Sequence, residues 1–221
     1  MTDLAALREA YRADKAALLG QLGQIQLRSV TVSRTLVKLT RLTDTLLTTL
    51  WQRTGLEDTG GCLMAVGGYG RGELLPHSDV DVLVLLPDTT QLDQDTALQS
   101  KLEAFIGSCW DVGLEIGSSV RTLSQCLAES DSDITVQTAL LESRCITGHA
   151  ELAKDFEVAY AQAMDAQAFF TAKTLEMRQR HTKYEDTPYA LEPNCKESPG
   201  GLRDLQIILW VAKAAGLGHT W

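Results

Sequence analysis

Two aspartates, Asp79 and Asp81, are the residues whose type and spacing point most directly to chemistry. They lie one residue apart in an apolar run that continues to Leu86. If the run forms a strand, side chains alternate between two faces, so both carboxylates share one face about 6–7 Å apart. Two like charges this close on an otherwise apolar strand resist desolvation unless a cation lies between them. Mg²⁺ is the expected cation, because it binds one or two carboxylates and completes its shell with water and phosphate oxygens.

A glycine-rich turn precedes the two aspartates. Residues 62–66 have the composition of a short buried strand, and Gly67 and Gly68 follow directly. Glycines allow a sharp turn whose bare amide groups can lie close to a triphosphate. The spacing does not fit a dinucleotide fingerprint, because the third glycine is misplaced and Pro76 follows instead of a helix. Each feature alone is common in loops, but their order favours a metal-dependent nucleotidyltransferase.

The pattern Gly-Gly, ten residues, Asp-x-Asp resembles the signature of the DNA-polymerase-β-like nucleotidyltransferase superfamily. Within it, the string Gly-Gly-Tyr-Gly-Arg-Gly-Glu-Leu at 67–74 is similar to the protein-PII uridylyltransferases. The resemblance implies an α+β fold: a polymerase-β-like core, with a small mixed sheet flanked by helices, and helical segments at both ends. It implies that Asp79 and Asp81 hold Mg²⁺, with Mn²⁺ as an alternative. The residues that it assigns to the nucleotide in this region are Gly67, Gly68, Arg71 and Ser78.

A second match lies at 196–206, where Lys-Glu-Ser-Pro-Gly-Gly-Leu-Arg-Asp-Leu-Gln resembles a string of the same family. It predicts a loop that ends in glycine and opens a helix. The expected apolar stripe of that helix consists of Leu205, Ile208, Leu209 and Ala212. Because helix starts attract anions, Lys196 and Arg203 are expected to bind the nucleotide phosphates. A capped helix with a surface ion pair is the alternative for these two residues.

A third stretch, 110–122, also resembles the family and predicts a strand after a helix. The superfamily resemblance implies a third carboxylate from a neighbouring strand, and the acids available are Glu115 and Asp111. Glu115 is preferred, because its apolar neighbours place it inside the strand. Asp111 stays an alternative, and an ion pair with Arg121 is the structural explanation for either acid.

The composition narrows the class of partner. A net charge of −9 disfavours template-directed polymerases and tRNA nucleotidyltransferases, because proteins that bind nucleic acid gain affinity from many lysine and arginine contacts. Five cysteines without a Cys-x-x-Cys pair indicate neither a disulfide framework nor a zinc site. No apolar run approaches the roughly 20 residues of a membrane span, and the start lacks a signal core. We therefore expect a cytoplasmic protein that binds neither nucleic acid nor membranes.

Hydrophobic periodicity predicts three parts along the chain. They are an N-terminal helical segment at 1–58, the nucleotidyltransferase core at 59–147 and a helical segment at 148–221. The predicted strands are 62–67, 79–86 and 114–121, and the predicted helices include 3 to about 22, about 28 to 54, 95–110 and a long stretch from about 149 to 183. The resembling proteins are several times longer. We therefore expect a fragment that neither removes uridylyl groups nor responds to glutamine.

The resemblance implies transfer of UMP from UTP to a tyrosine hydroxyl of the signalling protein PII, with release of pyrophosphate, in nitrogen regulation. Asp79 and Asp81 would hold the metal, Gly67 and Gly68 would cradle the β and γ phosphates, and Glu115 would complete the ion site or act as base. Adenylyl transfer to glutamine synthetase is one alternative, because that related family also uses a Gly-Gly and Asp-x-Asp site. A nucleotidyltransferase-like regulatory protein with another acceptor and a silent binding scaffold are the others.

Overall fold

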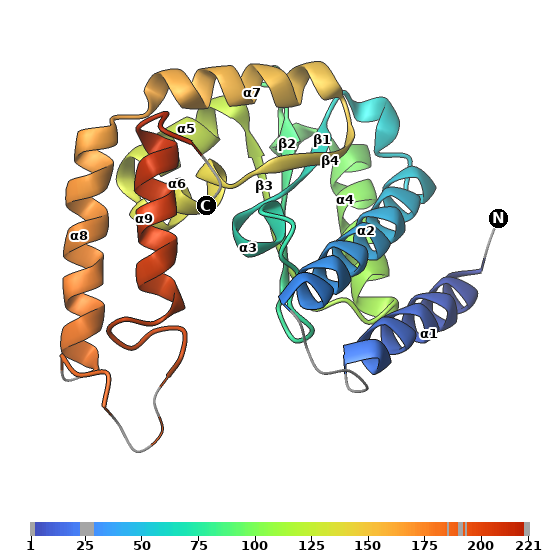
Figure 1. Cartoon of the computed structure of the whole chain (residues 1–221). Coiled ribbons are helices and arrows are strands. Elements are labelled where there is room, and N and C mark those ends of the chain that lie inside the picture. Colours follow the sequence, from blue (N-terminus) through green and yellow to red (C-terminus); the bar gives the residue numbers. More distant parts are fainter. Residues whose placement is uncertain (1–2, 23–28, 185, 190–191, 193, 219–221) are drawn as a thin grey trace. The chain divides into compact units, whose positions relative to one another are not determined.

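The structure, a computed structural model, describes residues 3–22, 29–184, 186–189, 192 and 194–218 (Figure 1). Contacts between elements divide the chain into two compact units. The first comprises 1–126 and 142–156, and the second comprises 127–141 and 157–221. The division into three parts along the chain stays a prediction. Among the described residues, no helix is both long and apolar enough to cross a membrane.

A four-stranded sheet, built from described residues of the first unit, carries the order β3-β2-β1-β4. Its strands are β1 (Cys62–Ala65), β2 (Val80–Leu86), β3 (Ile116–Thr122) and β4 (Arg144–Gly148). β2 and β3 are parallel, whereas β1 is antiparallel to both β2 and β4. This is the small mixed sheet expected from the resemblance. β4 was not predicted, because its short sequence is only partly buried at the edge of the sheet and gives a weak pattern.

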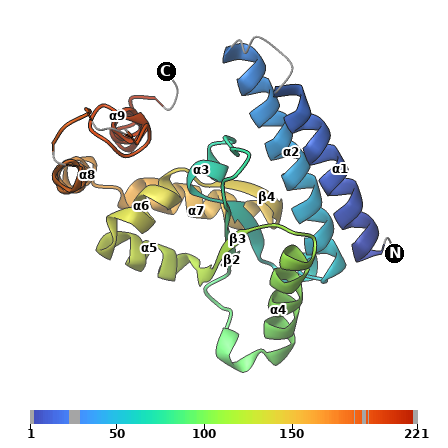
Figure 2. The same cartoon turned by 90° about the horizontal axis from the view of Figure 1, so that it is seen from below.

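Three helices of the first unit lie close to their predicted bounds: α1 (Leu4–Leu22), α2 (Ser29–Arg53) and α4 (Thr96–Asp111). The single helical turn α3 (Gly67–Gly70) and the short 3₁₀ turns at Glu57–Thr59 and Leu92–Gln94 were not predicted. α1 and α2 run side by side in both views (Figures 1 and 2). α4 begins where the side chain of Asp95 accepts a hydrogen bond from the Leu98 amide, which satisfies one of the free N–H groups of the first turn.

One face of the sheet packs on α2 and α4 (Figure 2). Val80 and Val82 of β2 lie in the core that these helices share. Trp51 of α2 and Phe105 of α4 meet there edge to face, with ring centroids 5.6 Å apart and planes at 83°. Burying each such side chain contributes about 1.5–3 kcal/mol. Because strand side chains alternate, this packing turns Asp81 to the opposite face of the sheet.

The second unit is helical. It holds α6 (Ile134–Leu141), α8 (Ala166–Lys183) and α9 (Leu202–Ala214), together with parts of α5 (Leu123–Ser132) and α7 (Ala150–Ala163), which begin in the first unit. The long helical stretch predicted from 149 to 183 is two helices, α7 and α8. The break falls at Asp165, whose carboxylate accepts hydrogen bonds from the amides of Gln167 and Ala168 and so starts α8.

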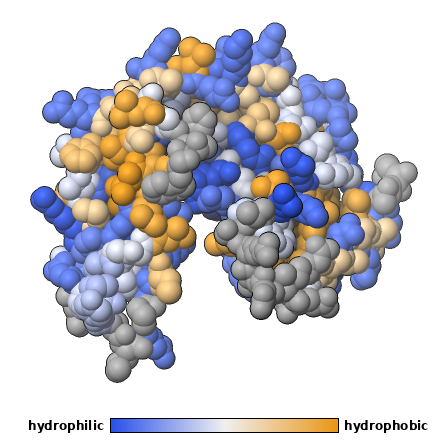
Figure 3. Space-filling view, in the orientation of Figure 1, coloured by the Kyte–Doolittle hydropathy of each residue, from blue (hydrophilic) through white to orange (hydrophobic). Residues whose placement is uncertain are grey.

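The predicted apolar stripe of α9 was wrong. Ile207 and Trp210 are buried with Phe169 of α8, whereas Leu205 and Ile208 are 48% and 58% exposed. Figure 3 shows apolar side chains exposed over α9. The helix has apolar residues on two faces, and the face that carries Ile207 and Trp210 packs on Phe169 of α8.

Candidate active site

The two aspartates lie at the start of a buried strand. β2 begins at Val80, one residue later than predicted, so Asp79 lies just before the strand and Asp81 within it. Both are exposed, whereas Val80 and Val82 are 4% and 1% exposed. The expected alternation of Asp81 with buried valines is therefore confirmed. A buried, apolar strand therefore carries the exposed carboxylate of Asp81, and Asp79 lies exposed directly before it.

Gly117 of β3 makes room for the Asp81 carboxylate. The two residues are partners in the parallel pairing of β2 with β3. A Cβ atom placed on Gly117 would overlap Oδ1 of Asp81. Gly117 was not among the site residues predicted from the sequence, although a glycine inside a strand commonly marks such a close approach. Any side chain at this position must displace the carboxylate.

The third carboxylate proposed from the sequence also lies at this end of the sheet. Glu115 lies one residue before β3 rather than inside it, and its carbonyl accepts a 2.8 Å hydrogen bond from the Val80 amide. Continuing the register of β2 with β3 one residue back pairs Glu115 with Asp79. The alternative, Asp111, ends α4 and lines a separate pocket with Arg8 of α1. The pairing favours Glu115.

The glycine turn lies next to the aspartates. The Val66 amide donates a 3.0 Å hydrogen bond to the Asp81 carbonyl, which ties the start of α3 to β2. Gly67 has a φ of 55°, and a Cβ atom there would meet nothing within 4 Å, while at Gly68 it would meet only the Arg71 guanidinium at 3.6 Å. The first N–H groups of a helix have no intrahelical partner. Among the described residues, the first amides of the turn therefore have no partner within the helix, and the left-handed backbone is at Gly67.

Arg71 and Gly70 hold the other end of this turn against the sheet. The Arg71 guanidinium bonds Glu73 at 3.0 Å and also the buried carboxylate of Glu142. A Cβ atom on Gly70 would overlap the Glu142 carbonyl oxygen. Arg71, expected to bind the nucleotide, thus has a structural ion pair as well, and its nucleotide contact stays a prediction. Ser78 is exposed, and its predicted role is likewise untested.

The residues at the start of β2 fit a magnesium ion. In the part of the chain that the structure describes, no group of three or more histidine, cysteine, aspartate or glutamate side chains is arranged to hold a metal. Mg²⁺ does not need such a group, because one or two carboxylates suffice when water and phosphate oxygens fill the remaining positions. Asp79 and Asp81 supply hard oxygen ligands, and the bare amides of α3 lie beside them.

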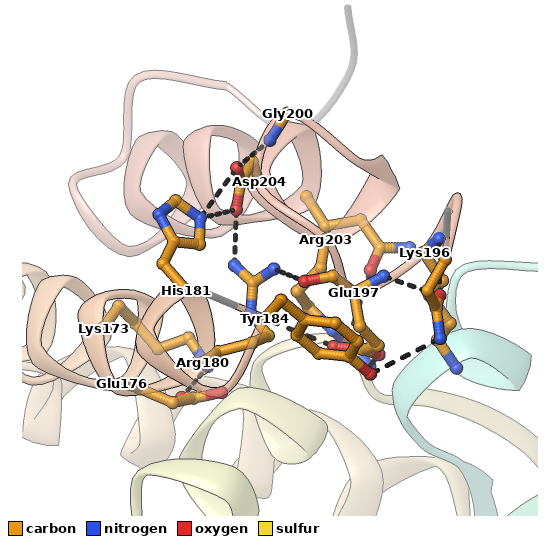
Figure 4. A network of polar contacts seen from close by, with 12 residues as sticks. Lys173, Glu176, Arg180, His181, Tyr184, Lys196, Glu197, Gly200, Arg203 and Asp204 are labelled. Carbon is orange, nitrogen blue, oxygen red and sulfur yellow. Dashed lines mark hydrogen bonds and ion pairs between the residues drawn. The ribbon is translucent and has the colours of Figure 1, made fainter. Parts of the chain in front are cut away.

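The second sequence motif forms a compact polar network in the second unit (Figure 4). Asp204 accepts hydrogen bonds from Arg180, from Nε2 of His181 at 3.0 Å and from the Gly200 amide at 2.7 Å. Burial alone would raise the pKa of Asp204, but these donors outweigh it, so the pKa lies below its ordinary value. The network fixes the loop that precedes α9 to the last turns of α8.

The predicted phosphate ligands of this motif, Arg203 and Lys196, differ in the contacts and exposure of their side chains. Arg203 bonds Glu197 and Gln206, each at 3.2 Å, and its guanidinium lies 5.4 Å from the Trp210 ring centroid. Arg203 therefore has the ion pair of the alternative interpretation, and its phosphate contact stays a prediction. The Lys196 side chain is exposed, while its backbone amide donates to the side chain of the neighbouring Asn194.

Comparison with known proteins agrees with both motifs. Residues 53–138 match the family described as nucleotidyltransferase domain, and residues 168–221 match that described as GlnD PII-uridylyltransferase. The chain is 55% identical over 214 residues to the bifunctional uridylyltransferase/uridylyl-removing enzyme of Ralstonia nicotianae, an alignment covering 97% of this chain and 24% of that protein. It is 62% identical over 183 residues to the protein of the same name from Burkholderia orbicola, covering 83% and 21% respectively. The chain thus spans about a quarter of the length of these relatives.

Proposed function

The chain belongs to the family of the bifunctional uridylyltransferase/uridylyl-removing enzymes, and on this basis we propose that it transfers UMP from UTP to a tyrosine hydroxyl of the protein PII. The observation that carries this proposal is the pair of exposed aspartates, Asp79 and Asp81, at the start of β2 beside the bare amides of α3. The activity, its substrates and a cytoplasmic location are parts of the same proposal.

The aspartates would bind the metal ion of the reaction. Mg²⁺ or Mn²⁺ held there would neutralise triphosphate charge and lower the pKa of the acceptor hydroxyl. The backbone of Asp81 is fixed by its pairing in the sheet, and the missing side chain at Gly117 leaves room for its carboxylate. Glu115, paired in register with Asp79, would complete the ion site or accept the proton of the acceptor hydroxyl.

The backbone of α3 would orient the nucleotide. We propose that the amides of Gly67 and Gly68 donate hydrogen bonds to the β and γ phosphates, with added charge from Arg71 and a hydrogen bond from Ser78. The acceptor oxygen then forms a bond to the α-phosphorus as the bond to pyrophosphate breaks. Rigid positioning of these donors is the main contribution that the chain makes to the rate.

In the second motif, we propose that the exposed Lys196 supplies positive charge to a phosphate. Arg203 is also proposed to contact the nucleotide, and its bond to Glu197 fixes the loop that carries Lys196. Both side chains are donors of the kind that bind phosphate oxygens.

A transfer assay tests the function. The 221-residue chain is incubated with Mg²⁺ and labelled UTP or ATP, with and without PII, and the mass of PII is measured. Addition of UMP is expected with UTP, and Asp81→Asn serves as the inactive control. Addition of AMP instead would favour an adenylyltransferase. An unmodified acceptor with both nucleotides would overturn the proposal for this chain.

A further inference from the structure

The glycine turn α3 is too short and too rich in glycine to hold its own geometry. It spans four residues, of which three are glycine. Glycine is the poorest helix former after proline, and a single helical turn has little stability by itself. The fixed position of its amides must therefore come from contacts with the rest of the unit. Its one residue with a long side chain, Tyr69, makes those contacts.

Tyr69 is held at three points. Its ring is 2% exposed, and its hydroxyl donates to Oδ1 of Asp44 in α2. Arg144 of β4 lies over the ring, 5.1 Å from its centroid, and one guanidinium nitrogen lies 3.5 Å from the Tyr69 carbonyl oxygen. Ring, hydroxyl and carbonyl are thus all contacted by two residues that come from different elements.

Asp44 and Arg144 also bind each other. The guanidinium donates to both carboxylate oxygens of Asp44, at 3.0 and 2.8 Å, which is the bidentate geometry of a strong ion pair. Burial raises the pKa of Tyr69, and the charge of Asp44 adds to the effect. The phenol, which is protonated at neutral pH in any case, therefore keeps donating to Asp44 at more alkaline pH as well.

We propose that Asp44, Tyr69 and Arg144 form a clamp of positioning residues that fixes α3, so that Gly67 and Gly68 present their amides to the nucleotide triphosphate. The clamp rests on the proposed function for its ligand. None of its three residues needs to touch the nucleotide. The contacts of Arg71 and Gly70 with Glu142 hold the same turn from its other end.

The test compares Tyr69→Phe with Tyr11→Phe in the 221-residue chain. Each change removes one buried hydroxyl that bonds α2, because the Tyr11 hydroxyl lies 3.1 Å from Oγ1 of Thr43, the residue before Asp44. Only the hydroxyl of Tyr69 belongs to α3, so only Tyr69→Phe removes a contact of that turn. We expect the kcat for UMP transfer to fall by about tenfold or more in Tyr69→Phe, since small misplacements of bound groups are costly. We expect Tyr11→Phe to transfer at the wild-type rate and to lose similar stability in urea.

Amide hydrogen exchange gives a second reading that needs no nucleotide. The Gly70 and Arg71 amides bond the Val66 and Gly67 carbonyls within the turn. They should exchange at least several times faster in Tyr69→Phe than in Tyr11→Phe. Asp44→Asn, which keeps an acceptor for the phenol, should show a smaller increase than Asp44→Ala.

The possible results distinguish failure of the clamp proposal from failure of the proposed function. Equal exchange in the two tyrosine variants would overturn the clamp, whatever the chain does to UTP. Faster exchange in Tyr69→Phe with no transfer by the wild-type chain would support the clamp and overturn the proposed function. Faster exchange with unchanged kcat and KM would show that the clamp does not serve the nucleotide, and this also overturns the proposal.

Discussion

The two sequence motifs differ in the surroundings of their carboxylates. In the first unit, Asp79 and Asp81 are like charges that stay exposed at the start of a buried strand. In the second unit, the carboxylates of Glu197 and Asp204 are bonded to arginines of α8 and α9. Ion pairs within the chain make a loop rigid, and two carboxylates that stay exposed next to each other offer oxygen ligands to a cation from solution. This difference supports the proposal that the metal binds at the first motif, and it shows that the loop of the second motif is held by internal ion pairs.

The largest effect on UMP transfer is expected when one of the two exposed carboxylates is removed. Asp81→Asn should lower UMP transfer about a thousandfold, because metal ligation stabilises the transition state by several kcal/mol and each 1.36 kcal/mol is tenfold in rate. Its unfolding free energy in urea should stay the same or rise slightly, since a repulsion is relieved. Asp93→Asn, also at an exposed acid, is the control for both readings. Lost stability, or near-normal transfer, would assign the pair a structural role.

Filling the space beside Asp81 is expected to have the next largest effect on transfer. Gly117→Ala should lower transfer about 10- to 100-fold by displacing the carboxylate. Gly107→Ala in α4 is the matched control, because its added Cβ atom meets nothing within 4 Å. That control should transfer normally and gain up to about 1 kcal/mol of stability. Equal transfer rates in the two variants would show that the Asp81 position is not critical.

Substitutions at the glycines in and after α3 distinguish the effect of backbone strain on stability from the effect of a side chain on nucleotide binding. Gly67→Ala and Gly72→Ala both place a side chain at positive φ, 55° and 77°, and each should cost about 1–2 kcal/mol of stability. Gly68→Val, at a position outside the positive-φ set, should raise the KM for UTP about tenfold through contact with the phosphates. Thermal unfolding and UTP titration of the three variants check this. A normal KM for UTP in Gly68→Val would show that the turn does not contact the phosphates.

The smallest effect on transfer is expected at the supporting network. Asp204→Asn should lower the unfolding free energy at pH 7 by about 1–3 kcal/mol, while transfer changes less than about tenfold. The pKa of Asp204 is lowered in the folded chain, so its stabilisation is present above the unfolded pKa of about 3.9 and is lost as pH falls through the folded value. The difference between wild type and Asp204→Asn should therefore shrink below about pH 4.

Urea unfolding between pH 7 and 3 measures that difference. Asp131→Asn, at an exposed aspartate of α5, is the control and should leave stability nearly unchanged. A difference that stays constant with pH would mean that Asp204 stabilises the network without its charge.

Local patterns were sufficient for much of the fold. The valines of β2 indicated both the strand and the outward face of Asp81, and the leucine spacing of α2 predicted its bounds within a residue. Long-range pairing was not accessible in the same way. β4 pairs with β1 although the partners Ala65 and Arg144 are 79 residues apart in sequence, and nothing in the five residues of β4 reveals that partner.

The candidate site shows the same limit. The acids and glycines were identified because their types carry chemistry, whereas Gly117 matters only through its position opposite Asp81. Asp44 and Glu142 were missed because each contacts the turn from a distant part of the chain. On α9, periodicity alone could not decide between two apolar faces, and the choice depended on the packing of Trp210.

The long separation between the turn and its supports has a consequence for how the chain is made. Arg71 and Glu142 are 71 residues apart in sequence. At roughly 5–20 residues per second, a ribosome adds Glu142 about 4–14 s after Arg71. During that interval β1 has no β4 to cover its edge, and Tyr69 has no Arg144 above its ring. A nascent chain therefore exposes an unpaired apolar strand edge, a feature that promotes aggregation and chaperone capture, until synthesis has passed residue 148.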